Sequence, residues 1–233
     1  MQLFICEQLK LEGNKLFIQN NKELFDQLRK VLRAKPWYDF YVQDYSWEAR
    51  YHVALESRAE KEIVTEILKK EEWKKTIKKS WMLISFPNKQ EKLELILQKL
   101  TEIWISDIFL WSSERSLLKE LNDKKLQRIT KIMKEAVEQS WWWNIPNLKI
   151  LSSLDELKND WSMIIFDLPR NKENSNWEEW KKPYLWVIGP EGGLTDKDYE
   201  NFPKNRIVQS LWENVLRMET AAIIGAWRLK NIK

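Results

Sequence analysis

Glycine is unusually scarce in this sequence. The 233 residues include 5 glycines and 15 tryptophans, whereas an average protein of this length has about 16 glycines. A single cysteine excludes an internal disulfide and fits a reducing cytoplasm. One cysteine and one histidine are also too few soft ligands for a zinc site, so we expect no metal.

Long hydrophobic runs are missing as well. None approaches the roughly 18 residues that a membrane-spanning helix needs, so we expect no membrane partner. The N-terminus, Met1 to Glu7, lacks the basic start and apolar centre of a signal peptide, which predicts a cytoplasmic protein. The 43% hydrophobic and 32% charged residues are typical of a globular chain. The net charge of +4 permits a nucleic-acid partner without requiring one.

The first 70 residues predict a small β-barrel with one helix. Aromatic and β-branched residues favour short strands at residues 3–6, 15–19, 38–43, 49–55 and 61–67. Apolar residues at helical spacing predict a helix over residues 22–33. We interpret Cys6 as a buried structural thiol and His52 as a structural residue. The charged stretch at residues 69–79 is interpreted as a solvated linker rather than a binding site.

From residue 81 onward, strands alternate with helices. This order predicts an α/β domain with a largely parallel sheet and helices on its faces. Ser153 and Glu156 form a capping-box pattern for a short helix, and the polar residues 171–182 predict a mobile loop. The expected strands are at residues 81–86, 105–110, 163–167, 185–188 and 206–211, and the expected helices are at residues 91–103, 123–139 and 219–230.

A glycine-rich turn follows one of these strands. The sequence Ile188-Gly189-Pro190-Glu191-Gly192-Gly193-Leu194-Thr195 ends with a residue that can cap a helix, with Asp198 three positions later. Glycines let a backbone approach a ligand closely, and ligands bind at the carboxyl ends of strands in open α/β sheets. A tight structural turn would look the same, so this motif alone leaves both interpretations open.

A second motif follows about twenty residues later, Leu211-Trp212-Glu213-Asn214-Val215-Leu216-Arg217-Met218-Glu219-Thr220-Ala221. In order and spacing, the two motifs resemble the cofactor loops of the SPOUT methyltransferases, specifically the family that methylates N3 of a uridine in 16S ribosomal RNA. That family shows Ile-Gly-Pro-Glu-Gly-Gly and then Leu-Gly-x-x-Ile-Leu-Arg-x-Glu-Thr-Ala. Further matches lie at residues 31–36, 98–102, 113–116 and 135–140, with Pro146 beyond.

The resemblance implies a fold and a reaction. Residues 1–70 would form a PUA-like β-barrel that binds RNA, and residues 71–233 a SPOUT methyltransferase domain with a trefoil-knotted C-terminus, a rare exception to unknotted folds. The implied cofactor is S-adenosylmethionine, the implied partner is the 16S ribosomal RNA of the small ribosomal subunit, and the protein would be a homodimer.

The resemblance also implies site residues. Arg217 would stabilise negative charge on the deprotonated uridine, although a salt bridge to Glu219 or to a facing subunit is the alternative. Glu191 would accept the proton or, as we prefer, hold the loop structure. The implied cofactor-binding residues are Phe166, Leu168, Ile188, Gly189, Pro190, Glu191, Gly192, Gly193, Leu211, Trp212, Asn214, Val215 and Leu216. The implied RNA contacts are Arg33, Lys35, Lys99, Arg115 and Ser116.

Two rival functions stay open. One is a non-catalytic RNA-binding protein on the same scaffold, and the other is a SPOUT enzyme acting on another RNA such as transfer RNA. Asp26 and Gln27 replace a His-His pair of the family, and Trp142 replaces an Arg, so RNA docking is expected to differ.

The remaining departures follow a rule, because tryptophan stands where the family has glycine or where a turn suits it. The positions are Trp37, Trp47, Trp104, Trp141 and Trp212. Some bacteria decode UGA as glycine and others as tryptophan. We therefore hypothesise that a gene in which UGA encodes glycine was translated with a code in which UGA encodes tryptophan. The alternative is a tryptophan-rich homologue with a crippled pocket.

Overall fold

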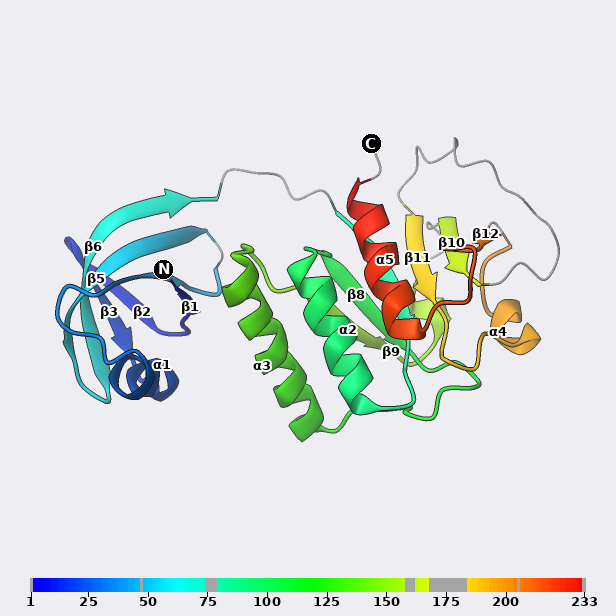
Figure 1. Cartoon of the computed structure of the whole chain (residues 1–233), viewed down its shortest axis with the longest axis horizontal. Coiled ribbons are helices and arrows are strands. Elements are labelled where there is room, and N and C mark those ends of the chain that lie inside the picture. The colour runs from blue at the N-terminus through cyan, green and yellow to red at the C-terminus, as the bar shows by residue number, and fades with distance from the viewer. Residues whose placement is uncertain are drawn as a thin grey trace. The chain divides into compact units, whose positions relative to one another are not determined.

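The computed structural model describes residues 2–46, 48–73, 79–157, 162–167, 184–204 and 206–231 (Figure 1). The chain divides into two compact units. Unit 1 comprises Met1–Thr76 and Val137–Asn144, and unit 2 comprises Ile77–Ala136 and Ile145–Lys233. The segment Val137–Asn144 thus packs with strands far from it in the sequence, an association that chain order does not reveal.

Unit 1 is built around a six-stranded sheet in the order β1-β4-β5-β6-β3-β2. The β1–β4 pair is parallel and the other pairs are antiparallel. β1 and β2 form the two edges, and no backbone pairing among the described strands closes the sheet into the expected barrel. The sequence pattern does not predict β2, whose side chains are mostly exposed. The strands are β1 (Leu3–Ile5), β2 (Leu9–Glu12), β3 (Lys15–Gln19), β4 (Asp39–Gln43), β5 (Ala49–Arg58) and β6 (Glu62–Glu72).

The helix expected over residues 22–33 is shorter and less regular in the structure. α1 spans Lys22–Asp26, and a π-helical turn, η1, continues it over Gln27–Val31. The Arg58 guanidinium of β5 donates a hydrogen bond of 3.1 Å to the carbonyl oxygen of Leu28. A contact from a distant strand therefore helps to shape this end of the helix, and local periodicity does not reveal such a contact.

The charged stretch at residues 69–79 is not a linker over its first part. Residues 69–72 continue β6 and pair with residues 49–52 of β5. Salt bridges of 2.7 Å (Lys69–Glu71) and 3.0 Å (Lys70–Glu72) join residues two apart, which lie on the same face of a strand. These charged residues belong to the largely exposed end of a strand, and residues 74–78 lie outside the described ranges.

The lone cysteine and histidine both have structural surroundings. Cys6 is buried and free, and its sulfur accepts a hydrogen bond of 3.4 Å from Asn21. His52 Nε2 lies 2.9 Å from Asp39 Oδ2, a hydrogen bond that lowers the pKa of Asp39. The His52 ring also stacks on Tyr41 with ring centres 4.6 Å apart. These contacts accord with the structural roles expected for the two residues.

Unit 2 contains a six-stranded sheet in the order β12-β10-β11-β7-β8-β9, with every pair parallel, as the alternating pattern predicts. In Figure 1, α2, α3 and α5 lie over one face of this sheet. The largely exposed strand β9 was not predicted. The strands are β7 (Trp81–Ser85), β8 (Asp107–Trp111), β9 (Asn147–Leu151), β10 (Ser162–Phe166), β11 (Tyr184–Ile188) and β12 (Arg206–Gln209). The helices are α2 (Gln90–Glu102), α3 (Asp123–Ser140), η2 (Leu154–Glu156), α4 (Asp196–Glu200) and α5 (Met218–Asn231).

Both faces of this sheet are buried, which explains its continuous apolar strands. Successive residues of β11 enter different cores. Trp186 and Ile188 join the core that contains residues of α2, α3 and α5. Leu185 and Val187 join a second core with Phe202, which follows α4. Because the central strands are covered on both sides, their free surface lies at the strand ends.

The carboxyl ends of three strands meet at one edge of the sheet. Phe166 at the end of β10 is in register with Ile188 of β11 and Gln209 of β12. The turn after β11 and the segment after β12 therefore begin side by side. In parallel sheets this edge is where ligands bind.

Three tryptophans have a backbone conformation that favours glycine. φ is +71° at Trp37, +71° at Trp104 and +57° at Trp141. All three are positions at which the UGA hypothesis expects glycine. Trp212 is not among the described residues with positive φ, and Trp47 lies outside the described residues.

Some expectations fall on residues that the structure does not describe. The loop expected at residues 171–182 and the expected cofactor residue Leu168 lie outside the described residues. Within the described ranges, no helix has the length and apolar character to cross a membrane. The same ranges contain no group of three His, Cys, Asp or Glu residues arranged to hold a metal ion.

Candidate active site

A cavity of about 490 Å³ opens at the carboxyl edge of the parallel sheet. Small-molecule and cofactor sites have volumes of roughly 300–1,000 Å³. Three segments supply most of its lining: the end of β10, the turn after β11, and the segment between β12 and α5. The expected cofactor residues that line it are Phe166, Ile188, Gly189, Pro190, Glu191, Gly192, Gly193, Leu211, Trp212, Asn214, Val215 and Leu216. The expected catalytic residue Arg217 lines it too.

The turn after β11 needs its glycines for two different reasons. Gly193 has φ +73°, and its amide donates a hydrogen bond of 2.9 Å to the Pro190 carbonyl oxygen. Gly189 needs space instead, because an added Cβ would meet Leu194 Cγ at 3.0 Å. The glycine turn, residues 189–194, is therefore a tight loop whose shape depends on missing side chains.

The contacts of Glu191 favour a structural role over proton transfer. Its carboxylate accepts hydrogen bonds from the Asn88 amide at 3.1 Å and from Lys92 Nζ at 2.9 Å. Burial alone would raise the pKa of Glu191, but these hydrogen bonds outweigh it and lower that pKa. A carboxylate with a lowered pKa is a weaker base, so the geometry favours the loop-holding role that we preferred.

The segment after β12 is more open than the glycine turn. Leu211 is buried, whereas the four residues that follow are exposed. The Trp212 side chain lines the cavity and is 51% exposed. Its carbonyl oxygen accepts a hydrogen bond from the Ser210 hydroxyl. The reactive candidate Arg217 is also exposed, at the end of this segment.

Arg217 does not pair with Glu219 among the described residues. Glu219 instead faces Lys92, with Oε2 at 3.7 Å from Nζ. Lys92 therefore lies between two carboxylates, since it also binds Glu191. Arg217 thus lines the cavity and, among the described residues, does not form the first of the two salt bridges that we considered as alternatives, the one with Glu219.

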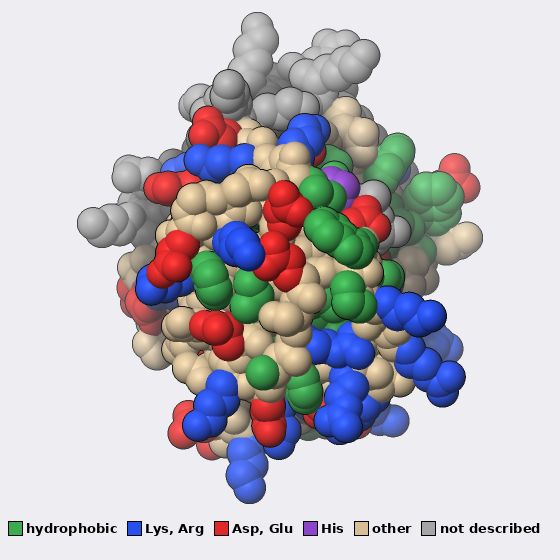
Figure 2. All heavy atoms as spheres, turned by 90° about the vertical axis from the view of Figure 1, so that its left-hand side faces the viewer, with side chains coloured by type: hydrophobic (Ala, Val, Ile, Leu, Met, Phe, Trp, Pro, Cys, Tyr) green, Lys and Arg blue, Asp and Glu red, His purple; other side chains and the backbone are tan. Residues whose placement is uncertain are grey.

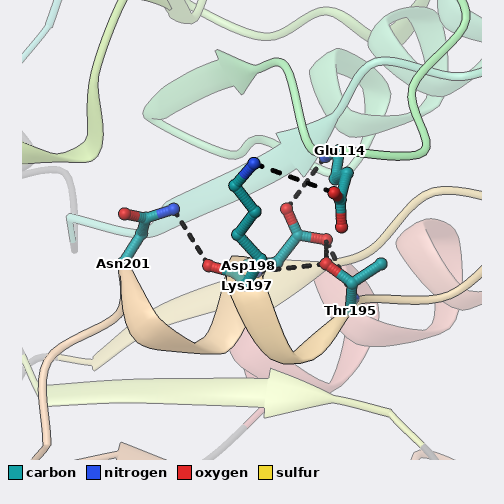
Figure 3. Close-up of polar contacts among 5 residues, drawn as sticks. All are labelled: Glu114, Thr195, Lys197, Asp198 and Asn201. Atoms are coloured by element: carbon teal, nitrogen blue, oxygen red, sulfur yellow. Dashed lines mark hydrogen bonds and ion pairs between the residues drawn. The ribbon is translucent and has the colours of Figure 1, made fainter.

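The helix after the turn begins at Thr195, the cap that the sequence predicts, and its cap is a full capping box. Asp198 accepts a hydrogen bond of 2.9 Å from the Thr195 amide, and the Thr195 hydroxyl accepts one of 3.2 Å from the Asp198 amide. The buried Asp198 carboxylate has a further partner. The Glu114 amide donates to it at 2.9 Å, which ties the loop after β8 to α4 (Figure 3).

The expected RNA contacts have different surroundings. The expectation that Ser116 contacts RNA disagrees with its burial, because the residue is 2% exposed and its hydroxyl pairs with that of Ser113 at 2.8 Å. Arg115 donates to the Gly192 carbonyl oxygen at 2.5 Å. Lys99 forms an ion pair of 2.8 Å with Glu102 on α2. Arg33 and Lys35 are exposed in unit 1.

Some cavity residues were not predicted. Lys92 is the most consequential, because it joins α2 to the glycine turn. No spacing signal separates it from Lys99, the other lysine of α2, so only the fold identifies it. The other unpredicted lining residues are Leu194, Ser210, Met218 and Ala221.

Curated proteins in two bacteria are similar to this chain. A curated relative in Bacillus subtilis (strain 168), named ribosomal RNA small subunit methyltransferase E, is 30% identical over 58% of this chain and 59% of its own length. A protein of the same name in Mesomycoplasma hyopneumoniae (strain 232) is 29% identical over 58% of this chain and 62% of its own length. The chain thus spans about three fifths of the curated relatives that it matches.

A solved structure has the same fold over nearly the whole chain. The ribosomal RNA small subunit methyltransferase E of Neisseria gonorrhoeae, bound to S-adenosyl methionine, superposes with a TM-score of 0.81 at 21% identity. The match covers 99% of this chain and 97% of that one. The family model of an RNA methyltransferase domain matches residues 74–229. Because that match spans well over half of the sequence, the chain belongs to the RNA methyltransferase domain family.

Proposed function

We propose that this chain transfers a methyl group from S-adenosylmethionine to N3 of a uridine in the 16S ribosomal RNA of the small ribosomal subunit. The observation that carries the proposal is the convergence of both sequence motifs on one cavity at the carboxyl edge of a parallel sheet. Family membership supports the reaction class. The names of the curated relatives support the substrate.

The residues of the cavity fit the cofactor. Phe166, Ile188 and Leu211 give an apolar wall that suits a purine ring, and the glycine turn exposes backbone groups for polar partners. The volume of about 490 Å³ suits a ligand of this size. When bound there, S-adenosylmethionine supplies an electrophilic methyl group on sulfur. The backbone of residues 188–193 and 211–216 holds and orients it.

Arg217 carries the charge chemistry in this proposal. Uridine N3 becomes a nucleophile only after it loses its proton, and the resulting negative charge spreads to the carbonyl oxygens of the base. A guanidinium at the cavity wall stabilises that charge as it develops. Glu191 and Lys92 keep the glycine turn in shape and take no part in the proton transfer.

Unit 1 holds the RNA in this proposal, as a PUA-like domain within residues 1–70. The exposed cations Arg29, Lys30, Arg33 and Lys35 follow one another around η1. Figure 2 shows Lys and Arg side chains gathered toward the lower right of the face in view. Such cations meet phosphates without distinguishing sequences. The C-terminal trefoil knot, the homodimer and the cytoplasmic location belong to the same proposal, and Lys99 on α2 is a further candidate RNA contact.

The test is transfer of labelled methyl groups from S-adenosylmethionine to unmodified small subunits, free 16S ribosomal RNA and transfer RNA. Label at uridine N3 in either 16S substrate supports the proposal. Label on transfer RNA alone would show a SPOUT enzyme with another substrate, and no label on any RNA would contradict methyltransferase activity.

One observation favours a non-catalytic RNA-binding protein. Trp212 places an indole at the cavity wall, in space that a cofactor needs. Thermal unfolding with and without S-adenosylmethionine separates the two functions, because a ligand that binds the folded state raises its stability by mass action. A melting temperature that does not respond to the cofactor favours the binding protein.

A further inference from the structure

The glycine turn is held from outside the cavity by the loop that follows β8. Arg115 Nη1 donates a hydrogen bond of 2.5 Å to the carbonyl oxygen of Gly192. The stem of the same side chain lies against the turn, since a Cβ added at Gly192 would meet Arg115 Cδ at 3.2 Å. Arg115 therefore contacts both the polar and the apolar surface of the turn.

The loop that carries Arg115 is itself fixed. The hydroxyls of Ser113 and Ser116 pair at 2.8 Å, and the two residues are 1% and 2% exposed. Between them, the Glu114 amide donates to the Asp198 carboxylate, which is itself buried at the start of α4 (Figure 3). The base of the Arg115 side chain thus has a defined position relative to the element that follows the turn.

We propose that Arg115 is a positioning residue for the glycine turn, and that it acts through Gly192 rather than by binding RNA. The inference rests on the proposed function, because the proposal assigns the cofactor to the cavity that this turn lines. A turn that is already in its binding conformation loses less conformational freedom when a ligand binds. Removing Arg115 should therefore weaken cofactor binding before any RNA is present.

Calorimetric titration of S-adenosylmethionine in the absence of RNA tests this role. We expect Arg115→Met to weaken binding about fivefold, since a charge-assisted hydrogen bond is lost. Arg115→Lys, which keeps the charge and one donor, should restore part of the affinity. The control is Lys131→Met, which removes a cation of α3 that pairs with Glu135 and should leave cofactor affinity unchanged. The opposite pattern overturns the proposal: unchanged cofactor affinity in Arg115→Met, with weaker RNA binding and a shallower salt dependence.

A second measurement separates this inference from the proposed function. The Gly193 amide bonds to Pro190 within the turn, so its hydrogen exchange reports the order of the turn without any ligand. We expect faster exchange at Gly193 in Arg115→Met and in Asp198→Asn, with the sheet amides unchanged. If the wild-type protein binds no S-adenosylmethionine, the proposed function fails while exchange still decides the role of Arg115. Unchanged exchange in both variants would refute it.

A different observation concerns the identity of three residues. Trp104 follows α2, and its amide donates to the Thr101 carbonyl oxygen at 3.0 Å, while the Ile105 amide donates to Leu100 at 3.1 Å. These two hydrogen bonds and the φ of +71° at Trp104 define a Schellman helix end. Glycine usually takes the left-handed position of this motif, because other L-residues are strained there.

Trp37 and Trp141 also stand where glycine is favoured. The Tyr38 amide donates to the Lys35 carbonyl oxygen at 3.0 Å across Pro36 and Trp37. With proline second and φ of +71° at the third residue, this is the pattern of a type II turn, which favours glycine at that position. Trp141, with φ +57°, is the first residue after α3.

From these three backbone positions and from the 5 glycines beside 15 tryptophans, we infer that the natural protein carries glycine at positions 37, 104 and 141. UGA codons decoded as glycine account for all three. The indole of Trp37 is 70% exposed, so glycine at that position removes little buried surface.

The test combines the gene with the protein isolated from its own cells. We expect UGA at all three codons, and tryptic peptides that contain glycine at the three positions by mass spectrometry. UGG codons, or native peptides with tryptophan at these positions, would overturn the inference.

Discussion

The two walls of the cavity are built in opposite ways. The glycine turn, residues 189–194, is bonded on one side to Asn88 and Lys92 through Glu191, and on the other side to Arg115 through Gly192. The facing segment, residues 210–217, exposes four consecutive residues after Leu211. From these contacts and exposures we interpret the first wall as ordered before a ligand arrives and the second as free to adjust.

In the proposed reaction, this difference suits one wall to the cofactor and the other to the RNA. A pre-ordered wall suits a cofactor that is the same in every cycle, because it reduces the entropy lost on binding. An adjustable wall suits a large RNA whose target base must enter the site. Arg217, the residue expected to meet that base, lies on the adjustable wall. Substitutions on each wall should therefore affect different steps.

The largest expected effect is on the adjustable wall. Arg217→Ala should lower the rate of methyl transfer about 100-fold or more, because a preorganised donor to the developing charge is lost. Affinity for S-adenosylmethionine should change little. Single-turnover transfer and calorimetry measure the two quantities, with Arg217→Lys as the control that keeps the charge. Equal loss of rate and of cofactor affinity would contradict the division between the walls.

The second effect is a gain on the same wall. Trp212→Gly should tighten S-adenosylmethionine binding by roughly tenfold, since the indole no longer occupies the cavity wall. The matched control is Trp227→Ala on α5, where an indole that is 60% exposed lies outside the cavity lining. Equal cofactor affinity in wild type and Trp212→Gly would show that the cavity tolerates the indole.

A smaller loss is expected on the ordered wall. Gly189→Ala places a Cβ at 3.0 Å from Leu194 Cγ, so the turn must shift, and cofactor affinity should fall several-fold. Gly225→Ala on α5 is the control, because its nearest neighbour would be at an ordinary 3.6 Å. Titration calorimetry compares the two variants, and similar affinities in both would mean that the turn is not a rigid wall.

The smallest expected effect depends on pH. Lys92 helps to lower the pKa of Glu191 below its ordinary value of 4.5, so their contact stabilises the folded state above that pH. The contribution is lost as pH falls through the lowered folded-state pKa. Thermal unfolding of Lys92→Met should therefore show a lower melting temperature than wild type at neutral pH and convergence in acid. A difference that persists in acid would assign the effect to packing.

Local signals in the sequence predicted the parts of the site that depend on neighbouring residues. The helix cap at Thr195 and the capping box at Ser153 are confirmed, because the partners in each lie within one turn of chain. The central strands are confirmed as well, since burial on both faces demands continuous apolar residues. The strands β2 and β9 were missed because they are mostly exposed and are defined by their partners.

Side-chain partners far apart in the chain escaped prediction. Ser116 carries a polar group that looks available for RNA, yet its partner Ser113 and the surrounding core bury it. The role of Lys92 depends on Glu191, which follows it by 99 residues. Local patterns contain no information on such pairs, and the fold must bring them together before they can be recognised.

These long separations have a consequence for the folding of the chain. The contacts of the glycine turn and of α4 link residues 77, 84 and 99 positions apart. Contacts between residues so far apart in the sequence form late, because closing the long loop costs entropy before the contact itself stabilises the fold. Protein synthesis delivers the N-terminal residues first, so Lys92 and Arg115 must wait for the turn to emerge. Ligand binding at this edge of the sheet thus requires that the domain has been synthesised as far as the turn. A nascent chain that ends before residue 192 has no finished site.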